Sequence, residues 1–399
     1  MTHLFLIGAL KTGTSQRLVR AALDGGYEVT IISPEEDEFR GIFPRGAKVI
    51  SMPMEASVIV RWILCQFADA HSRILITTTH DRYIQCAAEV CAAVAVPGPS
   101  PGSLRALASK ISQREFLRGL GLATLAFDSI SIADIGSLRE ILNRFRFPIV
   151  IKPERGSSSF GVSLCDNVET AIRHAIELAA DFCGKRQHCL TDILLIEEFQ
   201  PGREYCVELF DGKCVGVIRK EKRAGNTFIE RGYTSELDLD SHTFDAIIFA
   251  CEKAVAVAGF VWGPVHIDCI VRDGTTCIVE INPRIAGSFI TEIVQDAYGF
   301  DIVAALIKKL QGIDTGIPPI SAPESYARVE FFLGGDPELW HFDSEERFET
   351  RELRVRYGPQ VIESRERRGY LYVTKKVNSE RTRTNGAQAE PSRLVEAPM

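Results

Sequence analysis

The sequence lacks the features that mark secreted and membrane-spanning proteins. No stretch approaches the roughly 18 uncharged apolar residues that a membrane-spanning helix needs. Residues 1–10 contain a short apolar run with no cationic start before it and no small-residue cleavage site after it. Because a secretory signal needs both features, we expect none, and we expect a cytoplasmic protein with no membrane partner.

An excess of positive charge is also missing. The 399 residues include 46 Lys and Arg against 53 Asp and Glu, which gives a formal net charge of −7. Proteins that bind nucleic acid usually need a clustered basic surface to displace phosphate counterions. The charge therefore argues against a nucleic-acid partner and favours small-molecule chemistry.

Closely spaced pairs of cysteines are absent as well. The 11 cysteines are odd in number, none forms a C-x-x-C pair, and Cys206, Cys269 and Cys277 lie in apolar strand-like runs. Structural zinc sites usually contain such pairs, whereas free cysteine is among the residue types most often buried. We expect most of these cysteines to be small buried hydrophobic residues.

The length and the apolar content indicate several domains. With 45% hydrophobic residues the chain can bury a large core, and 399 residues favour two or three domains. The first hundred residues alternate short apolar runs with helix-like segments, which is typical of parallel strands with crossover helices. We predict an α/β domain over residues 1–102, a second domain over 103–312 with a lid at about 120–198, a strand-rich cap over 313–377 and a disordered polar tail over 378–399.

One segment near the N-terminus superficially resembles a phosphate-binding loop. Residues 8–15 read G-A-L-K-T-G-T-S at a strand-to-helix turn, but Thr14 stands where the phosphate-binding lysine would have to be. The segment also lacks the G-x-G-x-x-G spacing of a dinucleotide fold. We therefore predict a tight turn or an unspecific loop that faces a ligand.

The strongest pattern lies in residues 266–288, which read H-I-D-C-I-V-R-D-G-T-T-C-I-V-E-I-N-P-R-I-A-G-S. If residues 273–275 form a three-residue hairpin loop, Asp268 falls directly opposite Glu280. Opposed Cβ atoms lie about 5 Å apart, and like charges so placed repel each other. We therefore expect a positive group between the two carboxylates.

The same hairpin offers further polar ligands. Strand alternation places Asn282 on the face of Glu280, and two carboxylates with an amide oxygen suit Mg²⁺. Arg284 continues the alternation and could bind phosphate oxygens in bidentate fashion. His266, as a lone histidine on a strand, is more often simply hydrogen-bonded. An ordinary solvated hairpin is the alternative, and it is disfavoured by the apolar opposite face, Ile267, Cys269, Val279 and Ile281.

Two lysines and a glycine-rich loop precede the hairpin. Lys152 ends an apolar strand and is followed by residues 155–161, R-G-S-S-S-F-G. Such loops cover phosphates with backbone donors, and a neighbouring lysine supplies a point charge. Lys110 could reach the same nucleotide from the preceding helical region. Taken alone, the loop could also be a β-turn with an exposed lysine, which is the less favoured alternative.

A strand, a Pro-Gly break and a second strand follow in residues 194–209, L-L-I-E-E-F-Q-P-G-R-E-Y-C-V-E-L. Free backbone groups near the break could pair with an adenine edge, and Glu204 could accept hydrogen bonds from ribose hydroxyls. Taken alone, this segment is an ordinary hairpin with acidic residues.

In this order, Lys110, Lys152 with its glycine loop, I-E-E-F-Q-P-G-R-E and D-x11-E-I-N-P-R resemble the ATP-grasp superfamily over about residues 103–312. The resemblance implies an α/β and α+β ATP-grasp fold with an N-terminal parallel α/β domain, central ATP-binding subdomains and a small strand-rich C-terminal cap. It also implies ATP with Mg²⁺, or Mn²⁺, as cofactors. The implied roles are ATP-phosphate binding by Lys110, Lys152, Gly156, Ser157, Ser158, Ser159 and Gly161, an adenine hinge at Glu197, Glu198, Phe199 and Gln200, ribose binding by Glu204, metal binding by Asp268, Glu280 and Asn282, catalysis by Arg284 and Lys152, and substrate contacts from His266, Arg284, Gly287 and Ser288.

Within the superfamily, E-I-N-P-R-I-A-G-S and the late R-R-G-Y-L-Y-V-T segment look most like the L-amino acid ligase branch. That resemblance implies a ligase that activates a small carboxylate as an acyl phosphate and joins it to an amine, with amino acids as the expected substrates. Two alternatives stay open: an ATP-grasp carboxylase or related ligase whose nucleophile is not an amine, and a nucleotide-binding regulator without turnover. A homodimer is also left open.

Overall fold

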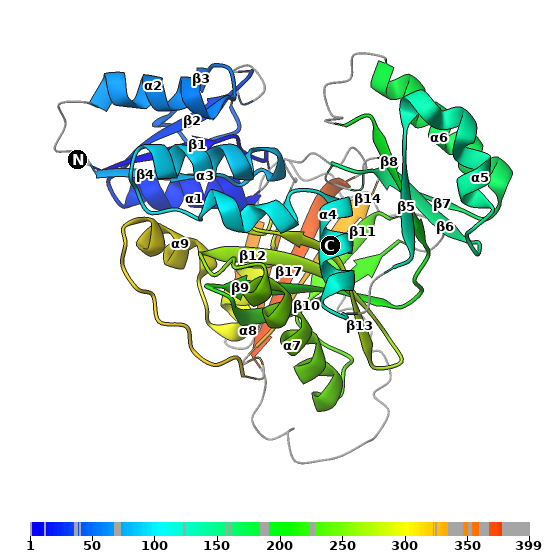
Figure 1. Cartoon of the computed structure of the whole chain (residues 1–399). Helices are drawn as coiled ribbons and strands as arrows, with labels where there is room; N and C mark the ends of the chain where they lie inside the picture. The colour runs from blue at the N-terminus through cyan, green and yellow to red at the C-terminus, as the bar shows by residue number, and fades with distance from the viewer. Residues whose placement is uncertain are drawn as a thin grey trace.

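Three β-sheets organise the chain, one in each of three lobes (Figure 1). In the described ranges, no helix has the length and apolar character needed to span a membrane. The computed structural model describes residues 2–11, 13–35, 39, 41–67, 73–122, 125–156, 159, 161–183, 191–223, 228–321, 323, 325–333, 346–349, 353–358 and 367–376.

The N-terminal sheet is parallel and has the strand order β3-β2-β1-β4. Its central strand β1 is a continuous apolar run because both faces are covered: Phe5 and Ile7 pack with α2 and α3, whereas Leu4 and Leu6 pack with α1. The predicted parallel α/β domain is confirmed, although β3 and α2 were not predicted. The elements are β1 (Thr2–Ile7), α1 (Gly13–Asp24), β2 (Glu28–Ser33), β3 (Ala47–Ser51), α2 (Ala56–Phe67), β4 (Arg73–Thr77), η2 (Asp81–Tyr83), α3 (Ile84–Ala93) and η3 (Pro101–Leu107).

A second sheet is antiparallel, has the order β5-β8-β6-β7 and possesses its own apolar cluster. Ile149, Ile151 and Ile196 are fully buried in this cluster together with side chains of α5 and α6. The lobe falls within the predicted lid region, and the domain boundaries themselves stay predictions. Its elements are β5 (Phe127–Ser131), η4 (Ile132–Ser137), α5 (Leu138–Leu142), β6 (Ile149–Pro153), β7 (Ser163–Cys165), α6 (Val168–Cys183) and β8 (Ile193–Glu198).

The central sheet has nine strands, in the order β13-β12-β9-β10-β11-β14-β17-β16-β15. Side chains on β9 alternate between two cores: Tyr205, Val207 and Leu209 pack with α7, whereas Cys206 and Phe210 pack with α8. The elements are α4 (Lys110–Gly119), β9 (Arg203–Phe210), β10 (Lys213–Lys222), β11 (Glu230–Thr234), α7 (Ser241–Val257), β12 (Pro264–Arg272), β13 (Thr275–Asn282), α8 (Ile290–Tyr298), α9 (Ile302–Leu310), β14 (Ser325–Leu333), β15 (Glu346–Glu349), β16 (Leu353–Gly358) and β17 (Arg367–Lys376).

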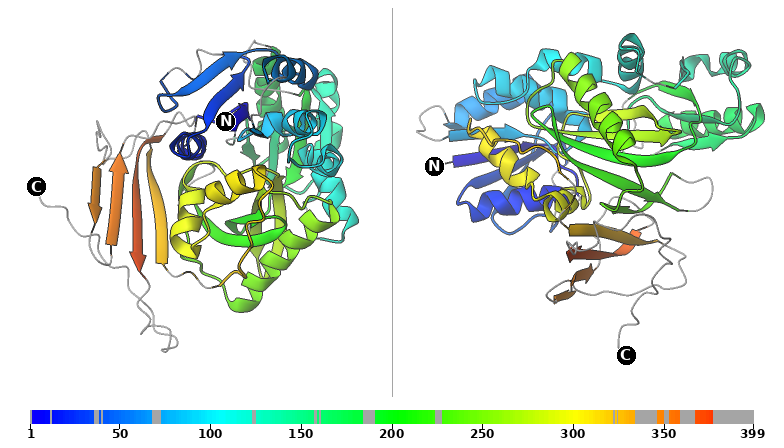
Figure 2. Two further views of the ribbon diagram at one scale, coloured as in Figure 1. Left: turned by 90° about the vertical axis from the view of Figure 1, so that its left-hand side faces the viewer. Right: turned by 90° about the horizontal axis from the view of Figure 1, so that it is seen from below.

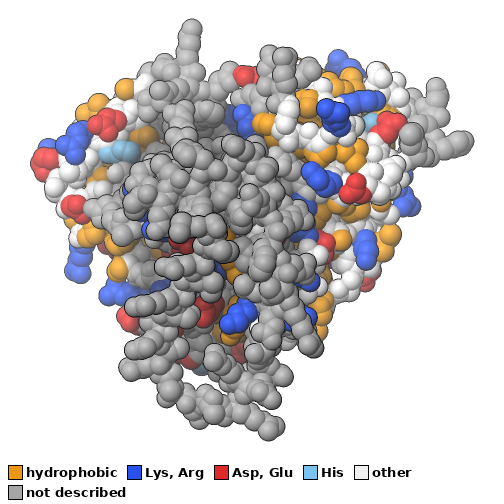
Figure 3. Space-filling view, turned by 180° about the vertical axis from the view of Figure 1, so that it is seen from behind, with side chains coloured by type: hydrophobic (Ala, Val, Ile, Leu, Met, Phe, Trp, Pro, Cys, Tyr) orange, Lys and Arg blue, Asp and Glu red, His pale blue; other side chains and the backbone are white. Residues whose placement is uncertain are grey.

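The C-terminal strands extend this central sheet. Strand β14 pairs with β11, and β17, β16 and β15 follow in turn, so the strands predicted as a separate cap add to an existing edge (Figure 2). The tail predicted over residues 378–399 lies outside the described residues. On the face seen in Figure 3, the visible Lys and Arg side chains are interspersed with acidic and apolar ones.

Candidate active site

The hairpin β12–β13 brings the two predicted carboxylates together. Asp268 is the register partner of Glu280, as predicted. The loop differs from the prediction, because Arg272 pairs with Thr275 and the turn therefore has two residues, Asp273 and Gly274, both with positive φ. A β-bulge next to the carboxylate pair restores the predicted register.

The bulge also changes the apolar face of the hairpin. Cys269 pairs with Ile278, which leaves Val279 as the extra residue of β13. Ile278 is therefore buried beside Ile267 and Ile281, whereas Val279 is half-buried. The prediction that Val279 belongs to the buried face is wrong, because strict period-two alternation does not hold across a bulge.

Each carboxylate has a lysine partner. The Lys220 Nζ lies 3.0 Å from Asp268 Oδ1, and the Lys110 Nζ lies 2.8 Å from Glu280 Oε1. Burial would raise the pKa of Asp268, but Lys220 and His266 outweigh burial and hold that pKa well below its usual range. The expected positive charge is thus present as two ammonium groups, and Lys220 was not among the predicted residues.

The hairpin's oxygen atoms also fit a hard cation. The two lysines contact Asp268 Oδ1 and Glu280 Oε1, and Asn282 follows Glu280 on the same strand face, opposite His266. Carboxylate and amide oxygens are the ligands that Mg²⁺ prefers. These three residues are chemically suited to hold the ion.

Lys110 connects the hairpin to the glycine loop. It begins α4, where the Ser109 hydroxyl caps the helix by accepting a hydrogen bond from Ser112 N at 3.2 Å. A lysine in the first turn opposes the helix macrodipole, so the fold places a positive charge there at a cost. Its Nζ donates to Gly156 O at 3.0 Å.

The described part of the glycine loop has a constrained backbone. Gly161 has φ 67°, and a Cβ at this position would lie 2.7 Å from Leu178 Cδ2. The Ser159 hydroxyl donates to Phe228 O at 3.1 Å, which ties the loop to the segment that precedes β11. Ser157 and Ser158, both predicted phosphate ligands, lie outside the described residues.

Lys152 lies in a buried cluster of charges. The Glu197 carboxylate accepts from Lys152 Nζ and Arg114 Nε, each at 2.5 Å, and all three side chains are buried. Burial lowers the pKa of Lys152, and the neighbouring Arg114 and Lys110 lower it further, against the opposing effect of Glu197. Lys152, Arg114 and Lys110 stand against two carboxylates, Glu197 and Glu280. The remaining positive charge suits a polyphosphate.

The predicted adenine hinge keeps part of its hydrogen-bonding capacity. The side chain of Glu197 points into the ion cluster, the Glu198 N–H donates to Ala126 O at 3.0 Å and the Phe199 N–H donates to Pro148 O at 3.1 Å. An adenine edge must therefore use the remaining backbone groups up to Gln200. Glu204, the predicted ribose ligand, forms an ion pair with Lys222.

His266 belongs to a buried polar group on β9 and β12. Its Nδ1 lies 2.6 Å from Glu208 Oε1, and burial, which lowers the pKa of His266, is outweighed by Glu208 and Asp268, which raise it. Donor atoms of Cys206, Glu208 and His266 all lie within 4.8 Å of one another. Glu208 was not predicted, although it follows Glu204 and Cys206 at the period-two spacing of one strand face.

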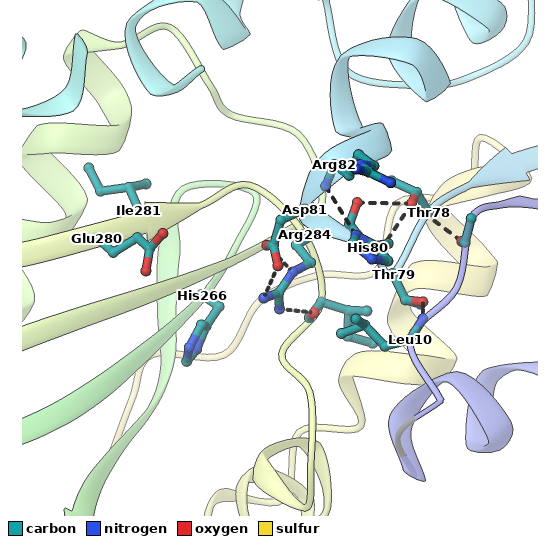
Figure 4. A network of polar contacts seen from close by, with 12 residues as sticks. Leu10, Thr78, Thr79, His80, Asp81, Arg82, His266, Glu280, Ile281 and Arg284 are labelled. Atoms are coloured by element: carbon teal, nitrogen blue, oxygen red, sulfur yellow. Dashed lines mark hydrogen bonds and ion pairs between the residues drawn. The ribbon is translucent and has the colours of Figure 1, made fainter. Parts of the chain in front are cut away.

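Arg284 is held by the N-terminal lobe. Its Nε and Nη2 donate to the two oxygens of Asp81, the latter at 3.0 Å, and its Nη1 donates to Ile285 O at 2.8 Å (Figure 4). Nearby, the Thr14 hydroxyl donates to Ser288 O at 3.0 Å. The start of α1 thus lies against the predicted substrate loop at Gly287 and Ser288.

The described cysteines behave as predicted. All nine of those described are free thiols, and seven of the nine are buried. The Cys206 group is the one place in the described ranges where a cysteine contributes to a set of potential metal donors.

Comparison with known proteins places this geometry in a family. A sequence profile of the ATP-grasp domain matches residues 145–292, which contain Lys152, the glycine loop and the hairpin. These residues form an ATP-grasp domain. The fold of the chain agrees with that of an L-amino acid ligase from Bacillus licheniformis, with a TM-score of 0.69 at 19% identity over 95% of both chains. A biotin carboxylase from Campylobacter jejuni gives a TM-score of 0.68 at 16% identity, over 94% of this chain and 87% of that chain.

Curated relatives match parts of this ATP-grasp chain. The uncharacterized protein y4rH of Sinorhizobium fredii is 25% identical over 233 residues, which are 58% of this chain and 48% of that protein. Carnosine synthase 1 of Gallus gallus is 25% identical over 186 residues, which are 44% of this chain and 20% of that protein. The chain thus spans less than half the length of these two relatives.

Proposed function

We propose that this ATP-grasp protein is a carboxylate–amine ligase that forms an amide or peptide bond through an acyl phosphate and releases ADP and phosphate. The observation that carries the proposal is the Asp268–Glu280 pair, joined through Lys110 to the glycine loop that follows Lys152. This arrangement combines metal-binding oxygens with cations for a polyphosphate, as transfer of the ATP γ-phosphate requires.

The nucleotide would lie between the lid sheet and the central sheet. Lys110 and Lys152 bind its phosphates, and the loop containing Gly156, Ser159 and Gly161 covers them. The remaining backbone groups of residues 197–200 bind adenine, and Glu204 binds ribose. The positive surplus around Lys152 supports this placement, because a polyphosphate would offset it.

Asp268, Glu280 and Asn282 would hold Mg²⁺ or Mn²⁺. The carboxylates of Asp268 and Glu280 and the amide of Asn282 make a hard donor set, which supports the assignment. A bound ion would offset charge on the phosphate oxygens during transfer.

The chemistry proceeds in two steps. A carboxylate oxygen of the acid attacks the γ-phosphorus, and the bond from that phosphorus to ADP breaks. The ammonium group of the second substrate loses one proton to solvent, and the neutral amine attacks the acyl carbon. The bond to phosphate then breaks, and the second proton of the amine leaves with the phosphate. Arg284 and the backbone amides of Gly287 and Ser288 stabilise the oxyanion, and the covering loop keeps water from the acyl phosphate.

Amino acids are the substrate class that the comparisons favour. One solved structure with a similar fold is an L-amino acid ligase, and one curated relative is a carnosine synthase. A carboxylase remains the second candidate, because a biotin carboxylase shares the fold.

Screening pairs of acids and amines for ADP release, with mass spectrometry of the product, tests the proposal. A ligase releases ADP only when both an acid and an amine are present, and forms their amide. ADP release that depends on bicarbonate or a thiol would favour the carboxylase or another acyl-phosphate ligase. ATP binding without substrate-dependent ADP formation would favour a regulator.

A further inference from the structure

Asp81, from the N-terminal lobe, forms a bidentate ion pair with Arg284 of the central lobe. We propose that Asp81 is a positioning residue for Arg284, and that the N-terminal lobe thereby completes the ligase site. The inference rests on the proposed function, because it assigns Asp81 to the guanidinium group that we place on the reacting atoms.

The hydrogen bonds of Arg284 leave a defined part of the guanidinium free for substrate. Two of its five N–H groups donate to Asp81 and a third donates to Ile285 O. The other two N–H groups form no hydrogen bond with the residues that the structure describes. A planar guanidinium fixed on one side in this way presents its remaining donors in one orientation, so little rotamer entropy is lost when a substrate oxygen binds.

The loop that carries Asp81 is itself fixed within the N-terminal lobe. The Thr79 hydroxyl accepts from Leu10 N at 3.2 Å and lies 2.8 Å from the Ser15 hydroxyl. The His80 N–H donates to the Thr78 hydroxyl at 3.0 Å, and the Arg82 N–H donates to His80 Nδ1 at 3.1 Å (Figure 4). Because these contacts do not involve Arg284, Asp81 is held in place independently of the side chain that it orients.

Packing reinforces the same loop. Gly8 has φ 66°, and a Cβ on it would lie 2.0 Å from Tyr83 Cδ2, so the ring of Tyr83 sits directly against the β1–α1 turn. The glycine in the segment resembling a phosphate-binding loop is therefore explained by contact with the Asp81 loop.

The charges around the pair are also suited to positioning. Burial would raise the pKa of Asp81, but Arg284 outweighs burial and keeps the carboxyl ionised. Burial lowers the pKa of His80 to about 4, so this neighbour adds no charge near neutral pH. The ion pair is locally neutral, and Arg284 nevertheless keeps donors for an oxyanion.

A simpler role would be to hold the two lobes together. The chain offers a matched control for that role, because Arg17 of α1 pairs with Asp301, before α9, at 3.1 Å between Nη2 and Oδ1. Both aspartates join the N-terminal lobe to the central lobe, but Asp301 contacts none of the proposed site residues. Asp301→Asn also keeps a side-chain oxygen for capping α9.

The test compares Asp81→Asn with Asp301→Asn in the full chain, by steady-state kinetics of acid- and amine-dependent ADP release and by thermal unfolding. We expect Asp81→Asn to lower kcat by about 10- to 100-fold, as a displaced catalytic group would, with an unchanged KM for ATP. Asp301→Asn should leave kcat unchanged, and its melting temperature should fall less than that of Asp81→Asn, because the Arg17–Asp301 pair is more exposed than the Arg284–Asp81 pair.

A second comparison asks whether Asp81 acts through Arg284. In an Arg284→Lys background, which cannot form the bidentate pair, Asp81→Asn should lower kcat by less than about 3-fold. Equal kcat values for Asp81→Asn and Asp301→Asn, or an undiminished loss in the Arg284→Lys background, would overturn the inference and leave the ligase proposal standing. A wild type that forms no ADP with any acid and amine would overturn both.

Discussion

Replacing Glu197 by glutamine tests the buried charge cluster beneath the proposed nucleotide site. The substitution preserves shape but leaves Lys152 and Arg114, both buried, without their shared carboxylate. Removing one partner of a buried ion pair typically costs about 3–5 kcal/mol. We expect Glu197→Gln to lower the free energy of unfolding by about that amount near pH 7.

The pKa of Glu197 determines how the stability difference between wild type and variant changes with pH. Burial would raise the pKa of Glu197, but Lys152 and Arg114 outweigh burial and lower it from 4.5 to about 2. The ionised form is thus favoured by folding, so its stabilisation is complete above pH 4.5 and is lost as the pH falls toward 2. The difference in stability between wild type and variant should shrink over that window.

Urea unfolding followed by circular dichroism, at neutral pH and near pH 3, measures this difference. Glu169→Gln is a matched control in the same lobe, because Glu169 pairs with Arg139 at 3.5 Å on the surface, with 73% of its side chain exposed. An exposed pair contributes at most about 1 kcal/mol. A Glu197→Gln variant as stable as the control at neutral pH, or a difference as large at pH 3 as at neutral pH, would refute the reasoning.

Two further substitutions test the metal ligands and the N-terminal turn. Glu280→Gln should abolish acid-dependent ADP formation and weaken Mn²⁺ binding measured by electron paramagnetic resonance, because it removes a carboxylate ligand; normal turnover would defeat the metal assignment. Gly8→Ala should destabilise the protein more than Gly26→Ala in thermal unfolding. Both force alanine into a left-handed backbone, at about 1–2 kcal/mol, but only Gly8 faces the ring of Tyr83, and equal losses would contradict this packing.

Local sequence patterns predicted the parts of the site that are close together in the chain. Asp268 does lie opposite Glu280, although through two differences that cancel: the turn is one residue shorter than predicted and the bulge at Val279 restores the register. Neither the turn type nor the bulge can be deduced from alternation, since several loops fit an Asp-Gly turn.

Partners from distant segments could not be predicted. Asp81 for Arg284, Lys220 for Asp268 and Glu208 for His266 all lie on other strands or loops. Periodicity shows which face of a strand is buried, but not which strand will lie beside it. For the same reason, the sequence did not predict that β14 continues the central sheet, because the residues of one strand do not determine which strand pairs with it.

The buried charge cluster around Glu197 could have been predicted from the chemistry of its side chain. Its place in I-E-E-F-Q indicates a hinge, yet an acidic side chain that follows the apolar run L-L-I also requires cationic partners if it is buried. Lys152 was already identified on the neighbouring strand. Arg114, four residues after Lys110 on one helix face, was the missing partner.

Transfer of oxygen from the acid to phosphate tests the central claim most directly. A carboxylic acid labelled with oxygen-18 would be incubated with ATP, Mg²⁺ and an accepted amine, and the released phosphate would be analysed by mass spectrometry. An acyl phosphate requires one labelled oxygen to pass from the acid into each phosphate. Unlabelled phosphate, released while amide accumulates, would contradict the account.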